Sequence, residues 1–182
     1  PHHTRVVPPA FPNPQPPFHT RMNLIWPIIT RALTHPRRIA AIDDQSRYTY
    51  GKLLGGSMFI AEQLDATTDR PHVGILLPTG GLFPMSLLGT WLAGRVAVPL
   101  NYLLSKDELR YVINDSQIDT IITVGPMLDF IGEGAIPEGI HLIKLEDADF
   151  TGFPPLRWPP NPKSDDLAVI LYTSDPSGRP KG

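Results

Sequence analysis

The residues best suited to chemistry stand together at the end of the sequence, in the stretch LYTSDPSGRPKG. Hydroxyl side chains, glycines and a lysine follow one another there, directly after an apolar run. Backbone N–H groups and hydroxyls can donate hydrogen bonds to phosphate oxygens, and a lysine adds a compact positive charge. The stretch therefore predicts a loop that holds a polyphosphate.

The spacing of this stretch does not match the two common phosphate-binding patterns. A P-loop requires a glycine, four residues and then Gly-Lys-Ser/Thr, whereas Lys181 follows Pro180 and precedes Gly182. A dinucleotide fingerprint requires G-x-G-x-x-G after a strand, and the pair Gly80–Gly81 lacks the third glycine. We interpret that pair as a tight turn.

Apolar runs alternate with amphipathic segments upstream of the terminal stretch. HVGILLP and DTIITVG are continuously apolar, as strands buried on both faces of a sheet are. A short strand is expected in EGIHLIKLED, and the last strand, LAVILY, leads directly into the terminal stretch. This alternation predicts an α/β fold with a mostly parallel sheet flanked by helices on both faces. Ligands of such sheets bind beyond the carboxyl ends of the strands, where we expect the terminal stretch to lie.

Helix signals are clearest in LLSKDELRYVIND. Ser105 and Glu108 are spaced as a capping box, and Leu104 and Leu109 as the hydrophobic staple around it. Thr49 is placed to cap a helix through YGKLLGGSMFIAEQL. Further helices are expected in MNLIWPIITRALTHP and residues 82–93, and a hairpin in IAAIDDQSRYTY.

Composition argues against several other classes of protein. A formal net charge of −2 gives no electrostatic case for binding nucleic acid. The sequence contains no cysteine, and its histidines show no ligand spacing, so no metal site is expected. The apolar stretch LFPMSLLGTWLAGRVAVPL is broken by glycines, prolines and an arginine, so we predict no transmembrane segment. Without cysteine or a targeting signal, the sequence predicts a cytoplasmic protein.

The first twenty residues contain seven prolines and little apolar periodicity. Such a segment cannot bury enough surface to offset the entropy lost on ordering. We expect residues 1–21 to be a disordered Pro-rich extension, with natural translation starting at Met22.

The terminal stretch, extended to DDLAVILYTSDPSGRPKG, resembles the phosphate-loop motif of the adenylate-forming (AMP-binding) superfamily. That motif reads Tyr-Thr-Ser-Gly-Thr/Ser-Thr/Ser-Gly-x-Pro-Lys-Gly. The blocks YTYGKLL, VGILLPTGG, LLGTWLAGRVAVPLN and LSKDELRYVINDSQIDTIIT are similar, in order and spacing, to the amino-terminal part of the same enzymes. The resemblance implies that residues 22–182 are a partial amino-terminal adenylation domain, incomplete and ending at the ATP phosphate loop.

The resemblance also implies an activity for the whole protein. It would be an ATP-dependent acid–CoA ligase, an acyl-CoA synthetase acting on a fatty-acyl or related carboxylate through an acyl-adenylate. ATP, Mg²⁺ and CoA are the cofactors implied. The superfamily's catalytic lysine and magnesium-contacting acid belong to later blocks, so no catalytic or metal residue is assigned and this fragment alone is expected to be inactive. By position, the ATP phosphate loop consists of Thr173, Ser174, Asp175, Pro176, Ser177, Gly178 and Lys181.

Two of these positions depart from the motif. Asp175 stands in the usual glycine place, and Pro176 stands in a usual hydroxyl place. A carboxylate repels one phosphate charge at ~4 Å by about 1 to 4 kcal/mol, depending on the effective dielectric. Proline removes a backbone donor and fixes φ. Both changes oppose phosphate binding.

Two alternatives to an acyl-CoA synthetase stay open. The chain could be a truncated or degenerate non-catalytic remnant, or a fragment of a peptide-synthetase adenylation domain. The preference for a CoA ligase rests on AGRVAVPLNYLLSKDELRYVINDS. The sequence downstream of Gly182 distinguishes an interrupted enzyme from a remnant.

Overall fold

The computed structural model describes residues 24–44, 46–148, 150, 152, 154, 156–161, 165–173 and 180–182. The extension expected over residues 1–21 lies outside this part of the chain. The described helices and strands, in chain order, are α1 (Ile25–Thr34), β1 (Ile39–Ile42), β2 (Arg47–Thr49), α2 (Tyr50–Thr67), β3 (His72–Leu76), α3 (Leu82–Leu92), β4 (Val96–Pro99), α4 (Lys106–Asp115), β5 (Thr120–Thr123), α5 (Gly125–Ile131) and β6 (His141–Lys144).

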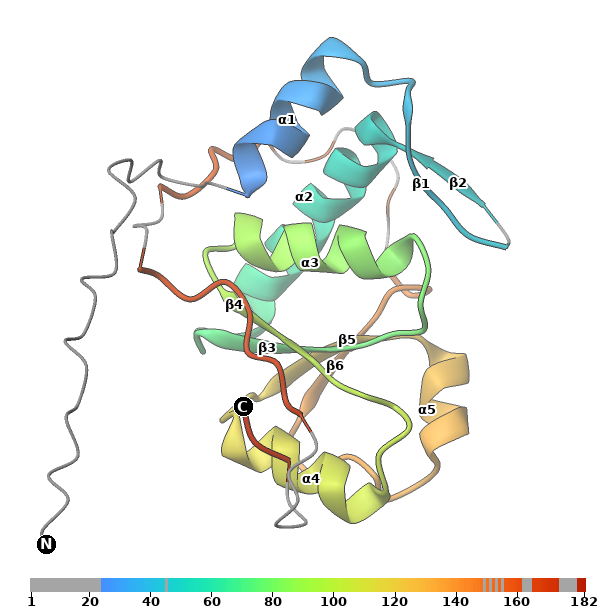
Figure 1. The fold of residues 1–182 in the computed structure, drawn as a ribbon, viewed down its shortest axis with the longest axis vertical. Coiled ribbons are helices and arrows are strands. Elements are labelled where there is room, and N and C mark those ends of the chain that lie inside the picture. The colour runs from blue at the N-terminus through green and yellow to red at the C-terminus, as the bar shows by residue number, and fades with distance from the viewer. Residues whose placement is uncertain are drawn as a thin grey trace, which may run out of the picture.

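Among the described residues, four strands form one parallel sheet in the order β4-β3-β5-β6. The helices α1, α2 and α3 cover one face of this sheet, and α4 and α5 cover the other (Figure 1). The strands β1 and β2 form a separate antiparallel hairpin. The predicted α/β class, the parallel sheet and the hairpin are confirmed.

Alternating side chains of the strands supply both hydrophobic cores. Val73 and Ile75 of β3 pack with α1, α2 and α3, whereas Leu76 packs with α4. Ile122 and Ile121 of β5 divide between the same two faces. A strand covered on both faces must be apolar at successive positions, which explains the continuous apolar runs.

The predicted helix starts are also confirmed. The Thr49 hydroxyl accepts a hydrogen bond from the Lys52 N–H at 3.2 Å. At the start of α4, Ser105 and Glu108 form the reciprocal capping box. Leu104 packs against the same cluster as Leu109, as expected for the staple.

The turn predicted at Gly80–Gly81 leads into α3, and a close contact accounts for its second glycine. A Cβ atom at Gly81 would overlap the ring of Tyr48. The Gly81 N–H donates to the Asp43 carboxylate at 2.9 Å, which places a negative charge at the positive end of α3. This glycine pair therefore serves packing between the hairpin and α3.

The prediction that LAVILY forms the last strand is wrong. Val169 meets Ala97 of β4 in a single parallel bridge. The Ala97 N–H donates to Ala168 at 3.0 Å, and the Ile170 N–H donates to Ala97 at 2.9 Å. The next outward-facing donor of β4 would belong to Pro99, which has no N–H. The ladder therefore stops at Ile170.

Candidate functional site

Of the predicted phosphate loop, the structure describes the two ends. Thr173 and Lys181 form an antiparallel bridge in which each backbone N–H donates to the other's carbonyl, at 2.9 and 3.0 Å. The structure therefore brings these two predicted residues together as the neck of the loop. The other predicted site residues, Ser174, Asp175, Pro176, Ser177 and Gly178, lie outside the described residues.

The segment that leads to the neck is held along β4 at the edge of the sheet. The Ala168 carbonyl accepts both the Ala97 N–H and the Trp91 indole N–H, the latter at 2.9 Å. Trp91 belongs to α3, so this one carbonyl ties the terminal segment to a strand and to a helix. Figure 1 shows the segment descending past β4 toward α4.

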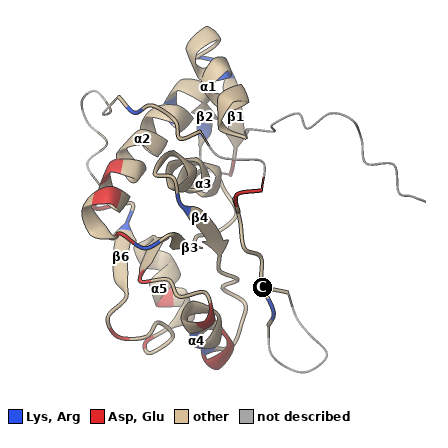
Figure 2. Ribbon diagram, turned by 90° about the vertical axis from the view of Figure 1, so that its left-hand side faces the viewer, with Lys and Arg blue, Asp and Glu red and all other residues tan. Residues whose placement is uncertain are grey.

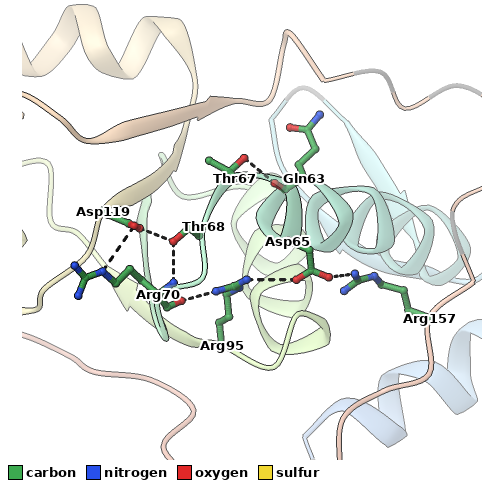
Figure 3. Close-up of polar contacts among 8 residues, drawn as sticks. All are labelled: Gln63, Asp65, Thr67, Thr68, Arg70, Arg95, Asp119 and Arg157. Atoms are coloured by element: carbon green, nitrogen blue, oxygen red, sulfur yellow. Dashed lines mark hydrogen bonds and ion pairs between the residues drawn. The ribbon is translucent and has the colours of Figure 1, made fainter.

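An ionic network lies where the Pro-rich connection passes the end of α2 (Figure 3). Asp65 of α2 pairs with both Arg157 and Arg95. The Arg95 side chain is 10% exposed and also donates to the Arg70 carbonyl at 2.5 Å. The Thr68 hydroxyl donates to Asp119 at 2.7 Å. This network fixes the connection against α2 before the chain reaches β4.

Tyr172, directly before the neck, is bonded to the last residue of α4. Its hydroxyl donates to the Asp115 carboxylate at 2.6 Å. The second carboxylate oxygen of Asp115 accepts from the Tyr111 hydroxyl at 3.3 Å. Burial of Tyr172, together with its bond to Asp115, raises the pKa of the Tyr172 hydroxyl above its ordinary value. Tyr172 is therefore a stable hydroxyl donor at neutral pH.

Gly182 packs against the same tyrosine from the other side of the neck. A Cβ atom at this position would lie 2.8 Å from two ring carbons of Tyr172 and 3.0 Å from the Ile170 Cγ2. Only a residue without a side chain allows this approach. The ring of Tyr172, which precedes the loop, thus contacts Gly182, which follows it.

An open groove of about 540 Å³ runs beside the neck. One wall contains His72, the first residue of β3, whose Nδ1 donates to the Ser116 carbonyl at 2.8 Å. The helix α4 returns from the end of β4 to the start of β5, so Asp115 and Ser116 lie at the amino-terminal edge of the parallel sheet. The groove lies at that edge, and not beyond the carboxyl ends of the strands, where we expected the terminal stretch. Two features bring the described part of the terminal stretch toward this edge. Its ladder with β4 stops at Ile170, because Pro99 lacks an N–H, and Tyr172 is bonded to Asp115.

Acidic residues occur at both ends of the helix next to the neck (Figure 2). Asp107 and Glu108 lie in the first turn of α4, where the helix dipole favours them, and Asp115 ends it. The two tyrosine hydroxyls on Asp115 partly compensate its charge, which otherwise opposes a bound phosphate.

Sequence reasoning missed Asp115 and the role of Tyr172. The two residues are 57 positions apart, and no short motif links them. The local signal was limited to the position of Asp115, which is the last residue of a well-punctuated helix. Its contact with the terminal segment depends on the path of that segment, which the apolar run alone does not specify.

The chain is thus an α/β protein with an open parallel sheet that is covered by helices. It carries a candidate nucleotide loop, rich in Gly, Ser and Lys, whose two ends are joined by a bridge near the edge of the sheet. The sequence model described as "AMP-binding enzyme" matches residues 29–182. The chain belongs to this family, and the resemblance to adenylate-forming enzymes is confirmed.

Individual relatives agree with this assignment. The chain is 30% identical to the mitochondrial malonate–CoA ligase of Homo sapiens over 174 residues, which cover 86% of the chain and 29% of the ligase. It is 30% identical to a plipastatin synthase of Bacillus subtilis over 84% of the chain and 4% of that protein. The chain therefore spans less than a third of either relative.

The fold matches solved structures of the same kind. The o-succinylbenzoate CoA synthetase of Bacillus subtilis, in complex with the acyl-adenylate intermediate, superposes with a TM-score of 0.72 at 26% identity. The match covers 85% of this chain and 40% of that structure. None of the described helices combines the length and the apolar character that a membrane span requires.

Proposed function

We propose that this chain is the amino-terminal part of an ATP-dependent ligase that activates a carboxylate as an acyl-adenylate and transfers the acyl group to CoA. The observation that carries the proposal is the family match, which extends through the phosphate-loop motif to Gly182. Two relatives, the malonate–CoA ligase and the o-succinylbenzoate CoA synthetase, are named as enzymes that join a carboxylic acid to CoA. Residues 22–182 would form the partial adenylation domain, and residues 1–21 an extension.

The family motif supports the following roles for the loop residues, and their chemistry is compatible with these roles. Thr173, Ser174 and Ser177 would donate hydroxyl hydrogen bonds to the β- and γ-phosphates, and Gly178 would offer its backbone N–H. Lys181 would add a positive charge beside the same oxygens. Mg²⁺ would arrive with the polyphosphate and neutralise part of its charge. Fixed donors and charges of this kind stabilise charge that develops when the carboxylate attacks the α-phosphate.

The same loop motif also serves a second candidate reaction. The plipastatin synthase match equals the malonate–CoA ligase match in identity, so activation of an amino acid by a peptide synthetase is the alternative. A third candidate is a remnant that no longer binds ATP. Asp175 and Pro176 favour it, because both oppose the binding of a polyphosphate.

An exchange assay separates these candidates. The complete gene product is incubated with ATP, Mg²⁺ and labelled pyrophosphate, together with dicarboxylic, aryl and fatty acids in one series and amino acids in another. Exchange stimulated by a carboxylic acid, followed by thioester formation on addition of CoA, supports the ligase. Exchange with amino acids alone supports the peptide-synthetase alternative. Absence of exchange and of Mg·ATP binding in calorimetry identifies the remnant.

The cellular location of the protein stays a prediction. We propose the cytoplasm, although the human relative is named as mitochondrial. Fluorescence microscopy of the tagged complete gene product tests this, and co-localisation with an organelle marker would contradict it.

A further inference from the structure

A short hydrogen bond to a carboxylate joins the end of α4 to the neck of the terminal loop. The Tyr172 hydroxyl and the Asp115 carboxylate lie 2.6 Å apart. That distance is typical of an O–H group bonded to an ionised carboxylate, which is about twice as strong as a neutral hydrogen bond. The Tyr111 hydroxyl, on the same helix, holds the second oxygen of Asp115 at 3.3 Å.

The backbone alone holds the neck weakly. The ladder with β4 ends at Ile170, because Pro99 offers no N–H. The bridge between Thr173 and Lys181 is isolated and has two hydrogen bonds. Short two-stranded pairs without further strands are marginally stable in water. The position of the neck must therefore depend on side chains.

Tyr172 is placed to supply this support. It precedes Thr173 in the chain, and its ring packs on Gly182, which follows Lys181. It also packs against the cluster between α4 and the sheet. Tyr172 thus belongs to one strand of the neck, its ring contacts the other strand at Gly182, and its hydroxyl is bonded to the helix α4.

We propose that Asp115 is a positioning residue for the candidate nucleotide loop, and that it holds Thr173 and Lys181 in place through Tyr172. Asp115 makes no contact with nucleotide in this role. It fixes the hydroxyl of Tyr172, and the ring of Tyr172 then fixes the two chain segments on which the phosphate-binding groups are mounted. The consequence for ATP rests on the proposed function, whereas the anchoring of the neck does not.

The first measurement is hydrogen exchange at the Thr173 and Lys181 amides in the complete gene product, because both amides donate into the bridge. Tyr172→Phe and Asp115→Asn should each accelerate exchange at both amides by about tenfold or more, as loss of a hydrogen bond to a charged group does. The double variant should exchange no faster than Tyr172→Phe alone, because both changes act on the same contact. The Ile121 amide in the core strand β5 serves as the reference and should not change.

A second readout reports on the contact itself. In the parent protein, Tyr172 should ionise above the ordinary tyrosine range in an absorbance titration near 295 nm. Asp115→Asn should lower this pKa in part, because burial of Tyr172 also raises it, and Tyr172→Phe should abolish this ionisation step. The matched control is Tyr111→Phe, which leaves the bond from Tyr172 to Asp115 intact. It should change exchange at the neck by less than about threefold.

The outcomes separate the anchor from the activity. Unchanged exchange at Thr173 and Lys181 in both variants, or equal acceleration by Tyr111→Phe, overturns the anchoring role. If the parent binds Mg·ATP in calorimetry, the two variants should bind it about tenfold more weakly. Equal affinity would refute the link to nucleotide while leaving the proposed function standing. A parent that fails to bind Mg·ATP would refute the proposed function, and the exchange and titration results would still decide the anchor.

Discussion

Substitution of Gly89 by alanine should destabilise the protein through the contact between α2 and α3. An added Cβ atom at Gly89 would lie 2.8 Å from Cγ2 and 2.9 Å from Cβ of Ile60, and 3.0 Å from the Ser57 carbonyl oxygen. Ile60 is β-branched and 1% exposed, so it has no free space to enter. The Ser57 hydroxyl also donates to the Met85 carbonyl of α3 at 2.9 Å, which locks the spacing of the two helices.

The size of the effect follows from two opposing terms. Forcing a methyl group into a packed core costs about 1–3 kcal/mol. Replacing glycine by alanine inside a helix returns about 1 kcal/mol. The obstacles at Gly89 are a branched side chain and backbone, so we expect the upper part of the cost and a net loss of about 1–2 kcal/mol. For a chain of this length that corresponds to a fall in Tm of about 3–6 °C.

A glycine of α2 supplies the matched control. A Cβ atom at Gly55 would meet one atom, the Cγ of Pro154 at 3.8 Å, which is ordinary contact. Gly55→Ala should therefore raise stability by about 0.5–1 kcal/mol. Thermal unfolding followed by circular dichroism, with urea titration of the same variants, measures both changes. Equal or higher stability of Gly89→Ala, or parallel changes in both variants, would refute the packing argument.

Three further predictions concern the start of α4 and the phosphate loop. Ser105→Ala removes the cap of α4 and should cost about 1 kcal/mol of unfolding free energy in urea titration; a loss below about 0.3 kcal/mol would contradict the capping role. The bonds from Ser105 depress the pKa of Glu108, so its contribution to stability is present at neutral pH and is lost as the pH falls through and below the ordinary glutamate value. The destabilisation caused by Glu108→Gln should accordingly shrink between pH 7 and pH 3 in thermal unfolding, and a pH-independent difference would exclude this explanation. The double change Asp175→Gly with Pro176→Thr should tighten Mg·ATP binding about tenfold or more, as removal of one repulsive charge predicts; equal affinities in calorimetry would show that neither residue impairs the loop.

Local chemistry made much of the fold predictable. The capping box of Ser105 and Glu108, the Thr49 cap and the glycine turn at Gly80 depend on residues within a few positions of one another, and each forms as expected. The parallel sheet followed from continuous apolar strands joined by helices. Such features can be predicted because the residues that determine each of them lie within one short segment.

The exceptions depend on a neighbour that the local pattern does not specify. LAVILY has the composition of a buried strand, but its partner β4 carries Pro99 at the position that would donate the next hydrogen bond. The short helix α5, Gly125–Ile131, was not expected, because its apolar periodicity is weak; its proline at the first turn was the available signal. The contact between Tyr172 and Asp115 arises from where the terminal segment goes once its ladder with β4 has ended.

The residues that support the ends of the loop and the residues of the loop itself differ in how well they suit nucleotide binding. The residues that support the ends of the loop are in place, since Tyr172 is bonded to Asp115, and Gly182 leaves room for the tyrosine ring. The departures from the family motif fall at Asp175 and Pro176, between those ends. Loss of ATP affinity through these two residues would leave the anchor intact, so exchange at the neck should be the same before and after Asp175→Gly with Pro176→Thr. If ATP affinity is instead lost because the contact between Tyr172 and Asp115 fails, hydrogen exchange at the neck and ATP affinity should change together. Measuring both quantities on the same set of variants therefore assigns any defect in nucleotide binding to the charge and backbone of the loop or to the support beneath it.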